Sequence, residues 1–180
     1  TRLALVEHSE GGLIAPMVAA TDKSLRGIVL MAGPSLTGRT ILRYQFGNSI
    51  KRDTSYKGAR RDSALKTVDT MIDSLTATSP WLKFFVDYDP LTTAPKVQVP
   101  TLILQGETDQ QVTPEQAAAL EQAIRAGGNR RVTRRMFAQA NHLFAQDPDG
   151  NPANYAALPQ PRVRSDVLAA LVTWLQEQLR

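Results

Sequence analysis

Three side chains that lie far apart along the chain could together carry out nucleophilic chemistry: Ser9, Asp109 and His142. A free serine hydroxyl is a poor nucleophile, so a histidine must take its proton as it attacks. A carboxylate must then orient that histidine and stabilise its charged form. The chain has two histidines, and His8 adjoins the serine, where we expect its side chain to point away from the hydroxyl. His142 is therefore the predicted base.

The segment around Ser9 predicts a sharp turn between a strand and a helix. Four apolar residues, 3–6, precede this polar segment, and Gly11, Gly12 and an Ala-rich helical pattern follow it. Such a turn lifts the serine oxygen clear of the sheet, and neighbours without Cβ atoms relieve its crowding. The backbone N–H of Glu10 would face a substrate oxygen that gains negative charge. Taken alone, a serine before two glycines more often belongs to an ordinary loop with a capped helix.

Short apolar runs alternate with helical patterns along the chain, which is typical of an α/β fold. A helix between two such strands implies parallel neighbours and a right-handed crossover. The loops at the carboxyl ends of parallel strands gather around one crevice. Because Ser9, Asp109 and His142 lie in such loops, we expect them to converge at one edge of a mostly parallel sheet flanked by helices. Strands are predicted over 3–7, 25–32, 99–106 and 131–137, and helices over 11–21, 113–126 and 165–179.

The stretch 35–90 differs from the rest, because strand-like runs disappear and helical segments carry aromatic and large apolar residues. These helices could form a bundle around a core of their own, or a cap whose apolar face covers a pocket for an acyl chain or an aromatic group. The linker from Asp89 to Pro95 is predicted to be extended. We expect three parts: the nucleophile strand, elbow, helix and next strand in 1–34, a helical cap insertion in 35–90, and the core with the Asp and His loops in 91–180.

Composition argues against several other functions. The net charge is +4, but the arginines nearest to forming a cluster would split between the two faces of a strand, so no nucleic-acid partner is expected. The absence of cysteine excludes disulfides and thiolate metal sites, and we expect no metal and no organic cofactor. No apolar run approaches membrane-spanning length, so no membrane partner is expected. The chain opens without Met, which leaves a removed signal peptide open beside a cytoplasmic location. The arginines in question are Arg130, Arg131, Arg134 and Arg135.

Three passages resemble the α/β-hydrolase superfamily: HSEGGLIAPMVAA with LRGIVLMAGP, VQVPTLILQGETDQQVTPEQAAAL, and ANHLF. The chain is similar to the C-terminal portion of the serine esterase and dienelactone-hydrolase-like branch, which overlaps the prolyl-oligopeptidase-type peptidases. By this resemblance Ser9 would be the nucleophile, and His142 the general base and then the acid. Asp109 would be the orienting carboxylate and the Glu10 N–H one oxyanion donor. The region 35–90 would correspond to the helical cap of such esterases.

Two features depart from the pattern of that family. Glu7 stands where the G-x-S-x-G elbow has its first glycine, so we expect the turn to relax around a bulky charged side chain. Members of the family also carry several strands before the elbow, and the loop after one of them supplies a second oxyanion N–H. The strand at 3–7 would then lack a partner on one side, which predicts a missing N-terminal segment, a companion chain or a homo-oligomer.

These observations together predict a serine hydrolase that acts on a small-molecule ester through an acyl-enzyme at Ser9. A carboxylesterase for small or medium acyl groups is expected, because the segment 35–90 is short and rich in apolar residues. A peptidase of related fold is the alternative among enzymes. A non-catalytic module that keeps the hydrolase scaffold as a binding surface is the alternative from another class, and Glu7 favours it.

Overall fold

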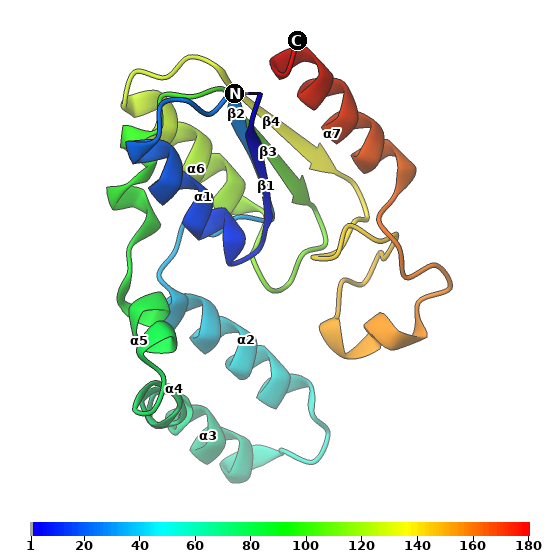
Figure 1. Cartoon of the computed structure of the whole chain (residues 1–180). Helices are drawn as coiled ribbons and strands as arrows, with labels where there is room; N and C mark the ends of the chain where they lie inside the picture. Colours follow the sequence, from blue (N-terminus) through cyan, green and yellow to red (C-terminus); the bar gives the residue numbers. More distant parts are fainter. Residues whose placement is uncertain (1) are drawn as a thin grey trace. The chain divides into compact units, whose positions relative to one another are not determined.

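The computed structural model describes residues 2–180, which divide into two compact units. Leu36–Asp89 form one unit, which consists of helices and is called the helical unit below. The chain on either side of this segment forms the other, which contains every strand of the described chain and is called the sheet unit (Figure 1). Each unit has a hydrophobic core of its own.

The sheet unit is built on four parallel strands in the order β1-β2-β3-β4 (Figure 1). The two central strands are buried along their whole length, as expected for apolar runs with both faces covered. The outer strands β1 and β4 are partly exposed. The predicted α/β fold with a mostly parallel sheet is therefore confirmed. The strands span Ala4–His8 (β1), Gly27–Met31 (β2), Thr101–Gly106 (β3) and Val132–Phe137 (β4).

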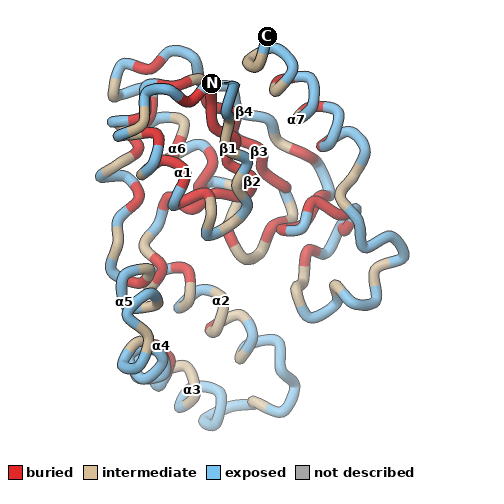
Figure 2. The backbone as a smooth tube through the Cα atoms, viewed as in Figure 1, coloured by how far each residue is buried: buried red, intermediate tan, exposed pale blue. Residues whose placement is uncertain are grey.

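Helices cover both faces of the sheet, because alternate strand residues point to opposite sides. Ile28 of β2 packs in a cluster with α1 (Gly11–Thr21) and α6 (Glu115–Ala126). Its neighbour Val29 packs in a second cluster with α7 (Ser165–Gln178), which includes Trp174. Figure 2 shows the buried residues concentrated along the strands between these helices.

Strand β1 forms one edge of the sheet in the described part of the chain. The N–H of Arg26 donates to the carbonyl of Leu3, and the N–H of Ser9 donates to the carbonyl of Met31. In a parallel ladder the backbone groups of alternate residues point to the same side. The N–H and C=O groups of the residues between them are therefore directed away from β2, at Ala4, Val6 and His8. Val6 is 41% exposed at this open edge.

The linker 89–95 corrects one prediction. It is not extended: two short 3-10 turns, η1 (Pro90–Thr92) and η2 (Ala94–Lys96), follow one another before β3. Proline at the start of such a turn has a suitable fixed φ and leaves no N–H unsatisfied. A third turn, η3 (Pro152–Ala157), lies within the long connection 138–161 between β4 and α7.

The helical unit has a small core with an apolar surface outside it. Val68, Ile72 and Val86 are buried at its centre. Exposed ion pairs join α2 to α4, with Arg39 Nη2 2.9 Å from an oxygen of Asp73. Several large apolar side chains stay exposed: Tyr44, Met71, Leu75, Trp81 and Phe84. The helices span Gly38–Arg52 (α2), Gly58–Lys66 (α3), Val68–Thr76 (α4) and Pro80–Asp87 (α5).

Candidate active site

Ser9 occupies a strained turn between β1 and α1. Its φ is +55°, in the left-handed region that residues with a side chain rarely adopt. Backbone hydrogen bonds hold this conformation, since the serine N–H donates to Met31 at 2.8 Å and the serine carbonyl accepts from Gly12 at 2.9 Å. Strain of this kind persists where the surrounding structure imposes it, and it is concentrated at functional sites.

Two glycines make room at this turn. A Cβ atom at position 11 would overlap a carboxylate oxygen of Glu7, and one at position 12 would lie 2.6 Å from the Cα of Gly33. The turn therefore accommodates Glu7 through the glycine at position 11 and does not relax around it. The close approach of Gly12 and Gly33 brings the start of α1 against the end of β2.

The start of α1 offers unpaired backbone donors beside the serine. Glu10 precedes the helix with helical angles, φ −54° and ψ −37°. Among the described residues, neither the N–H of Glu10 nor that of Gly11 has a hydrogen-bond acceptor. Free N–H groups at a helix N-terminus carry partial positive charge and favour an anionic oxygen.

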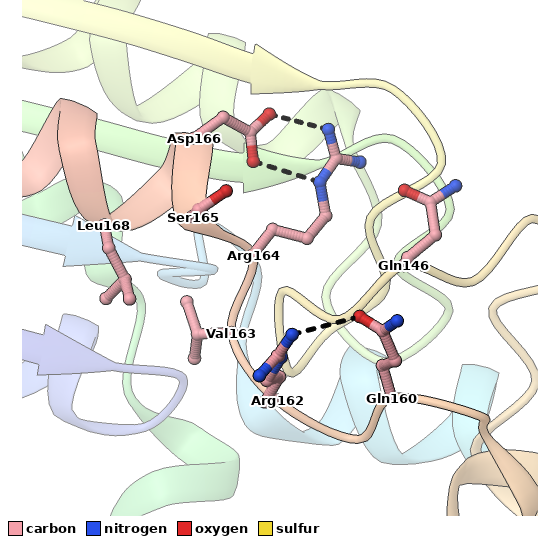
Figure 3. A pocket seen from close by; sticks show the side chains of 8 residues that line it. All are labelled: Gln146, Gln160, Arg162, Val163, Arg164, Ser165, Asp166 and Leu168. Carbon is pink, nitrogen blue, oxygen red and sulfur yellow. Dashed lines mark hydrogen bonds and ion pairs between the residues drawn. The ribbon is translucent and has the colours of Figure 1, made fainter.

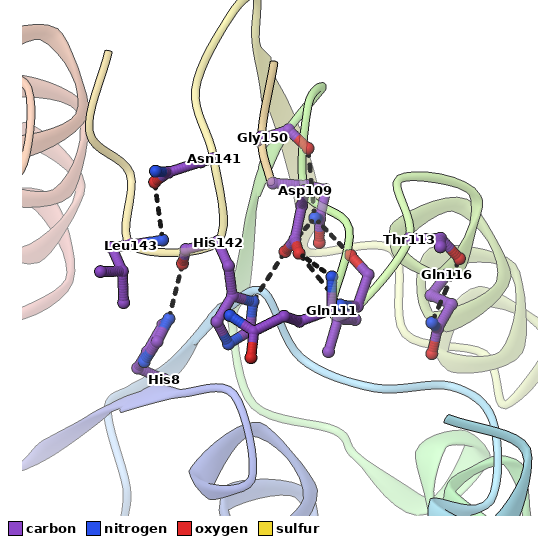
Figure 4. Close-up of polar contacts among 12 residues, drawn as sticks. His8, Asp109, Gln111, Thr113, Gln116, Asn141, His142, Leu143 and Gly150 are labelled. Carbon is purple, nitrogen blue, oxygen red and sulfur yellow. Dashed lines mark hydrogen bonds and ion pairs between the residues drawn. The ribbon is translucent and has the colours of Figure 1, made fainter. Parts of the chain in front are cut away.

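A buried hydrogen bond joins Asp109 to His142, with Nδ1 of the imidazole 2.8 Å from Oδ2 of the carboxylate (Figure 4). Both side chains are almost fully buried. The other carboxylate oxygen accepts from the N–H groups of Gln111 at 2.8 Å and Val112 at 3.0 Å. Oδ2 also accepts from the side-chain amide of Gln105 at 3.0 Å. A buried carboxylate needs such partners, and the bond at Nδ1 leaves Nε2 of His142 free to accept a proton.

The loop that carries His142 is fixed by its own polar network. The side-chain oxygen of Asn141 accepts from the N–H groups of Leu143 at 2.9 Å and Ala145 at 3.1 Å. The amide nitrogen of Asn141 donates to Asp147 at 3.1 Å. The sequence marks this stretch as rich in Asn, Asp, Pro and Gly, but nothing in that composition specifies which of these residues would pair.

His8 contacts His142, and sequence reasoning missed this contact. Nε2 of His8 lies 2.8 Å from the backbone oxygen of His142, and the two ring centroids are 4.7 Å apart. The residues are 134 positions apart, and no spacing rule pairs positions so distant. Desolvation of the ring lowers the pKa of His8 below its usual value, even though the residue as a whole is exposed.

Gln105 and Tyr155 are two further residues near this pair that the sequence did not single out. Gln105 is fully buried, and its Oε1 has no partner among the described residues. The hydroxyl of Tyr155, on η3, lies 3.4 Å from the carbonyl of Gly150, and partial burial raises the pKa of this phenol. Neither residue type has a spacing pattern that indicates a site.

The structure thus brings two of the three predicted side chains into direct contact, and the third follows a residue that contacts one of them. Asp109 and His142 share a hydrogen bond, and Ser9 follows His8, which contacts His142. The hydroxyl of Ser9 has no hydrogen-bond partner among the described residues. A serine turn, a buried carboxylate–imidazole pair and free backbone donors are the parts that acyl transfer uses.

A pocket of about 640 Å³ lies elsewhere, at the start of α7 (Figure 3). Arg162, Arg164, Asp166 and Leu168 are among its lining residues, and none of the predicted catalytic residues belongs to it. The guanidinium of Arg164 pairs with Asp166 at 2.6 Å, so this charge is already matched. The pocket is therefore not the candidate active site.

Neither a metal-ligand cluster nor a membrane-spanning helix is present among the described residues. No group of three or more His, Cys, Asp or Glu side chains is placed to hold a metal ion. Within that same part of the chain, every helix is too short or too polar to cross a lipid bilayer.

Solved structures with the α/β-hydrolase fold are similar to this chain. An esterase from Pyrococcus furiosus matches 97% of the chain with 12% identity and a TM-score of 0.56. A monoacylglycerol lipase from Paleococcus ferrophilus matches 97% with 17% identity and a TM-score of 0.54. An acylaminoacyl peptidase from Pyrococcus horikoshii matches 98% with 12% identity and a TM-score of 0.58. Identities this low establish the fold alone, which is the one that the sequence resemblance predicted.

The chain is shorter than these proteins. It spans 52% of the length of the esterase, 68% of the lipase and 24% of the peptidase. A comparison with curated proteins found no match.

A family model identifies the group of proteins more closely. The model of the prolyl oligopeptidase family matches residues 66–180, which include both Asp109 and His142. Ser9 lies outside the matched range. The matched range covers more than half of the chain, and the chain therefore belongs to the prolyl oligopeptidase family.

Proposed function

We propose that this chain carries the nucleophile, the base and the orienting carboxylate of a serine hydrolase, in Ser9, His142 and Asp109 respectively. The observation that carries the proposal is the buried Nδ1–Oδ2 hydrogen bond of 2.8 Å, next to the strand that leads into the serine turn. This bond fixes the tautomer of the imidazole and stabilises the imidazolium that forms during acyl transfer.

The proposed reaction begins when Oγ of Ser9 attacks the carbonyl carbon of an ester and its proton passes to Nε2 of His142. The N–H of Glu10 donates to the oxyanion of the tetrahedral intermediate. When the intermediate collapses, the bond to the alcohol oxygen breaks and that oxygen takes the proton from His142. Water then gives a proton to His142 and attacks the acyl carbon. The carboxylic acid leaves, and the proton returns to Ser9.

A carboxylic ester with a small or medium acyl group is the proposed substrate. The helical unit supports this, because it exposes large apolar side chains such as Trp81 and Phe84 that could contact an acyl chain. We propose this unit, Leu36–Asp89, as a cap. The solved structures named as an esterase and a monoacylglycerol lipase agree with ester chemistry.

Peptide hydrolysis is the second candidate function. It is favoured by the match to the prolyl oligopeptidase family and by the likeness to an acylaminoacyl peptidase. The same three side chains would act on an amide, with His142 protonating the leaving amine.

Labelling with a fluorophosphonate tests the serine hydrolase proposal against a non-catalytic module. We expect a stable adduct on Ser9, detected by mass spectrometry of the peptide that contains it, and no adduct after Ser9→Ala. Ser24→Ala removes an exposed serine of the same unit and serves as the matched control, which should label normally. A wild-type chain that stays unlabelled, or a Ser9→Ala chain that labels equally fast, would contradict the proposal.

Turnover by the protein expressed from its complete gene separates the two candidate functions. We expect a p-nitrophenyl butyrate signal larger than that from an aminoacyl p-nitroanilide, and loss of both signals after Ser9→Ala. Faster release from the anilide would support the peptidase instead. Hydrolysis of neither compound would rule out both.

A further inference from the structure

We infer that His8 is a positioning residue that holds His142 in register with Ser9, through the hydrogen bond from its Nε2–H to the backbone carbonyl of His142. The catalytic meaning of this inference rests on the proposed function, whereas the contact itself does not. Nε2 and the carbonyl oxygen are 2.8 Å apart, and the ring centroids are 4.7 Å apart with the planes inclined by 49° (Figure 4).

The topology of the sheet shows why such a contact matters. Ser9 follows β1, and His142 lies in the loop after β4, so the two residues come from strands at opposite edges of the sheet. No ladder hydrogen bond joins these two strands, because β2 and β3 lie between them. The His8–His142 bond connects the serine strand directly to the histidine loop.

The two polar contacts of His142 constrain different parts of the residue. The Asp109 carboxylate holds the Nδ1 edge of the imidazole, while His8 holds the backbone carbonyl of the same residue. The ring of His8 also packs near the rings of His142 and Phe144, with centroids 4.7 Å and 6.2 Å away respectively. A displacement of His142 would therefore have to break one hydrogen bond or open a ring contact.

The carbonyl partner fixes the protonation of His8. A carbonyl oxygen only accepts, so Nε2 of His8 must carry a proton and a neutral ring must leave Nδ1 bare. Desolvation lowers the pKa of His8, and the nearby His142 adds to this effect, while the His142 carbonyl and Asp109 oppose it. The neutral Nε2–H form is therefore the one expected at neutral pH.

Nuclear magnetic resonance of histidine side chains tests the inference without any turnover. The chain has two histidines, so ¹⁵N-histidine labelling gives two imidazoles, which a His8 variant assigns at once. In the wild-type chain we expect the proton of neutral His8 on Nε2. A neutral His8 with its proton on Nδ1 overturns the inference, and this outcome does not depend on any substitution.

Two substitutions separate the hydrogen bond from the bulk of the ring. His8→Phe keeps a ring without the donor, and His8→Gln keeps an amide N–H near the position of Nε2. We expect exchange of the His142 Nδ1 proton with water to become about tenfold faster in His8→Phe, and to stay near the wild-type rate in His8→Gln. Val6→Phe, which adds a phenyl ring two residues earlier on the same face of β1, is the matched control and should leave the proton unaffected.

Fluorophosphonate labelling gives the functional readout in the same variants. We expect Ser9 to label about five- to tenfold more slowly in His8→Phe, the size expected for one lost hydrogen bond, with recovery in His8→Gln. Unchanged proton exchange and unchanged labelling in a folded His8→Phe protein overturn the inference. If wild-type Ser9 does not label at all, the proposed function fails, and the proton-exchange result still decides whether His8 positions His142.

Discussion

The carboxylate of Asp109 is the most completely bonded polar group of the candidate site. Its two oxygens accept four hydrogen bonds, from backbone N–H groups, from the Gln105 amide and from His142. Every neighbouring group donates, so the position requires an acceptor on all sides. An isosteric amide would replace one carboxylate oxygen by an NH₂ group, from which the backbone N–H groups of Gln111 and Val112 cannot accept and from which His142 accepts only in its other tautomer.

Asp109→Asn is therefore expected to turn the imidazole of His142 to the wrong tautomer, with its proton on Nε2. We predict that fluorophosphonate labelling of Ser9 falls by about 10³- to 10⁴-fold. Asp166→Asn, at an exposed carboxylate paired with Arg164, should label at the wild-type rate. A loss smaller than tenfold in Asp109→Asn would mean that this carboxylate does not orient the base.

His8 gives a pH prediction with a definite sign. Its pKa is lowered from 6.5 in the folded protein, so between the lowered pKa and 6.5 the unfolded chain binds more protons than the folded protein. The free energy of unfolding is therefore expected to rise with pH across this window. Urea unfolding of wild type and His8→Gln from pH 5 to 7.5 measures the effect. The difference between their free energies of unfolding should change with pH at the acidic end and become constant at the alkaline end. Parallel profiles at all pH values would show that His8 is not perturbed.

The predictions made from the sequence at single residues depended on local context. Asp109 and His142 could be found because each lies in a loop after a buried strand, and chain order then restricts their roles. The contact of His8 with His142 could not be predicted, since the two residues are 134 positions apart and no sequence periodicity indicates the path of the long loop 138–161. Gln105 lies near the end of a buried strand, and nothing in that position distinguishes a residue that bonds to Asp109 from one that only fills the core.

Among the elements, the end of β3 sets the path of the histidine loop. A Cβ atom on Gly106 would overlap the carbonyl oxygen of Ala140 and lie 2.7 Å from that of Asn141. The loop therefore passes directly against the strand, and only glycine leaves the space for it. Asp109 lies three residues after Gly106, so this close approach brings His142 within reach of its carboxylate.

Gly106→Ala is predicted to displace this loop and to lower the free energy of unfolding by about 2–3 kcal/mol. The downfield proton signal of His142 Nδ1 should be lost or shifted with it. Gly47→Ala, within helix α2, is the control, because a Cβ there would lie 3.9 Å from its nearest neighbour, a side-chain atom of Leu65, and about 1 kcal/mol of stabilisation is expected. Chemical unfolding measures both variants, and equal, small effects would mean that the loop does not depend on Gly106.

The strands and main helices could be predicted to within about two residues, because buried apolar runs and caps determine them. The linker 89–95 could not, because its 3-10 turns follow from packing of Pro90 and Ala94 that short sequence windows do not encode. The sequence also gives no signal for the turn η3, because its residues, PANYAA, are mostly exposed and show no apolar period.

At the level of the whole chain, the sequence left two interpretations of 35–90, and the helical unit has features of both. It has a core around Ile72, as a bundle requires, and it also exposes a set of large apolar side chains that a packed bundle does not need. Exposed apolar groups of this size are associated with binding surfaces. Periodicity alone could not separate these interpretations, since it predicts helices without saying what covers them.

If the helical unit contacts the acyl group, replacing Trp81 and Phe84 by serine should affect long esters selectively. We expect kcat/KM for p-nitrophenyl octanoate to fall about tenfold, the effect of losing about 1.5 kcal/mol of apolar contact. The value for p-nitrophenyl acetate should not change. Both are measured with the protein from its complete gene, and an equal fall for both esters would argue against a cap.

The open edge of β1 has a consequence for reactivity. The nucleophile of the proposed mechanism, Ser9, directly follows β1, which in the described part of the chain pairs on one side with β2. The amides of Ala4, Val6 and His8 face away from β2. An extended backbone that paired with this edge of β1 would make the turn at Ser9 more rigid without contacting the turn itself. The nucleophilicity of Ser9 would then depend on whether a strand is paired along these three residues of β1. Rapid deuterium uptake at their amides would show that this edge is unpaired.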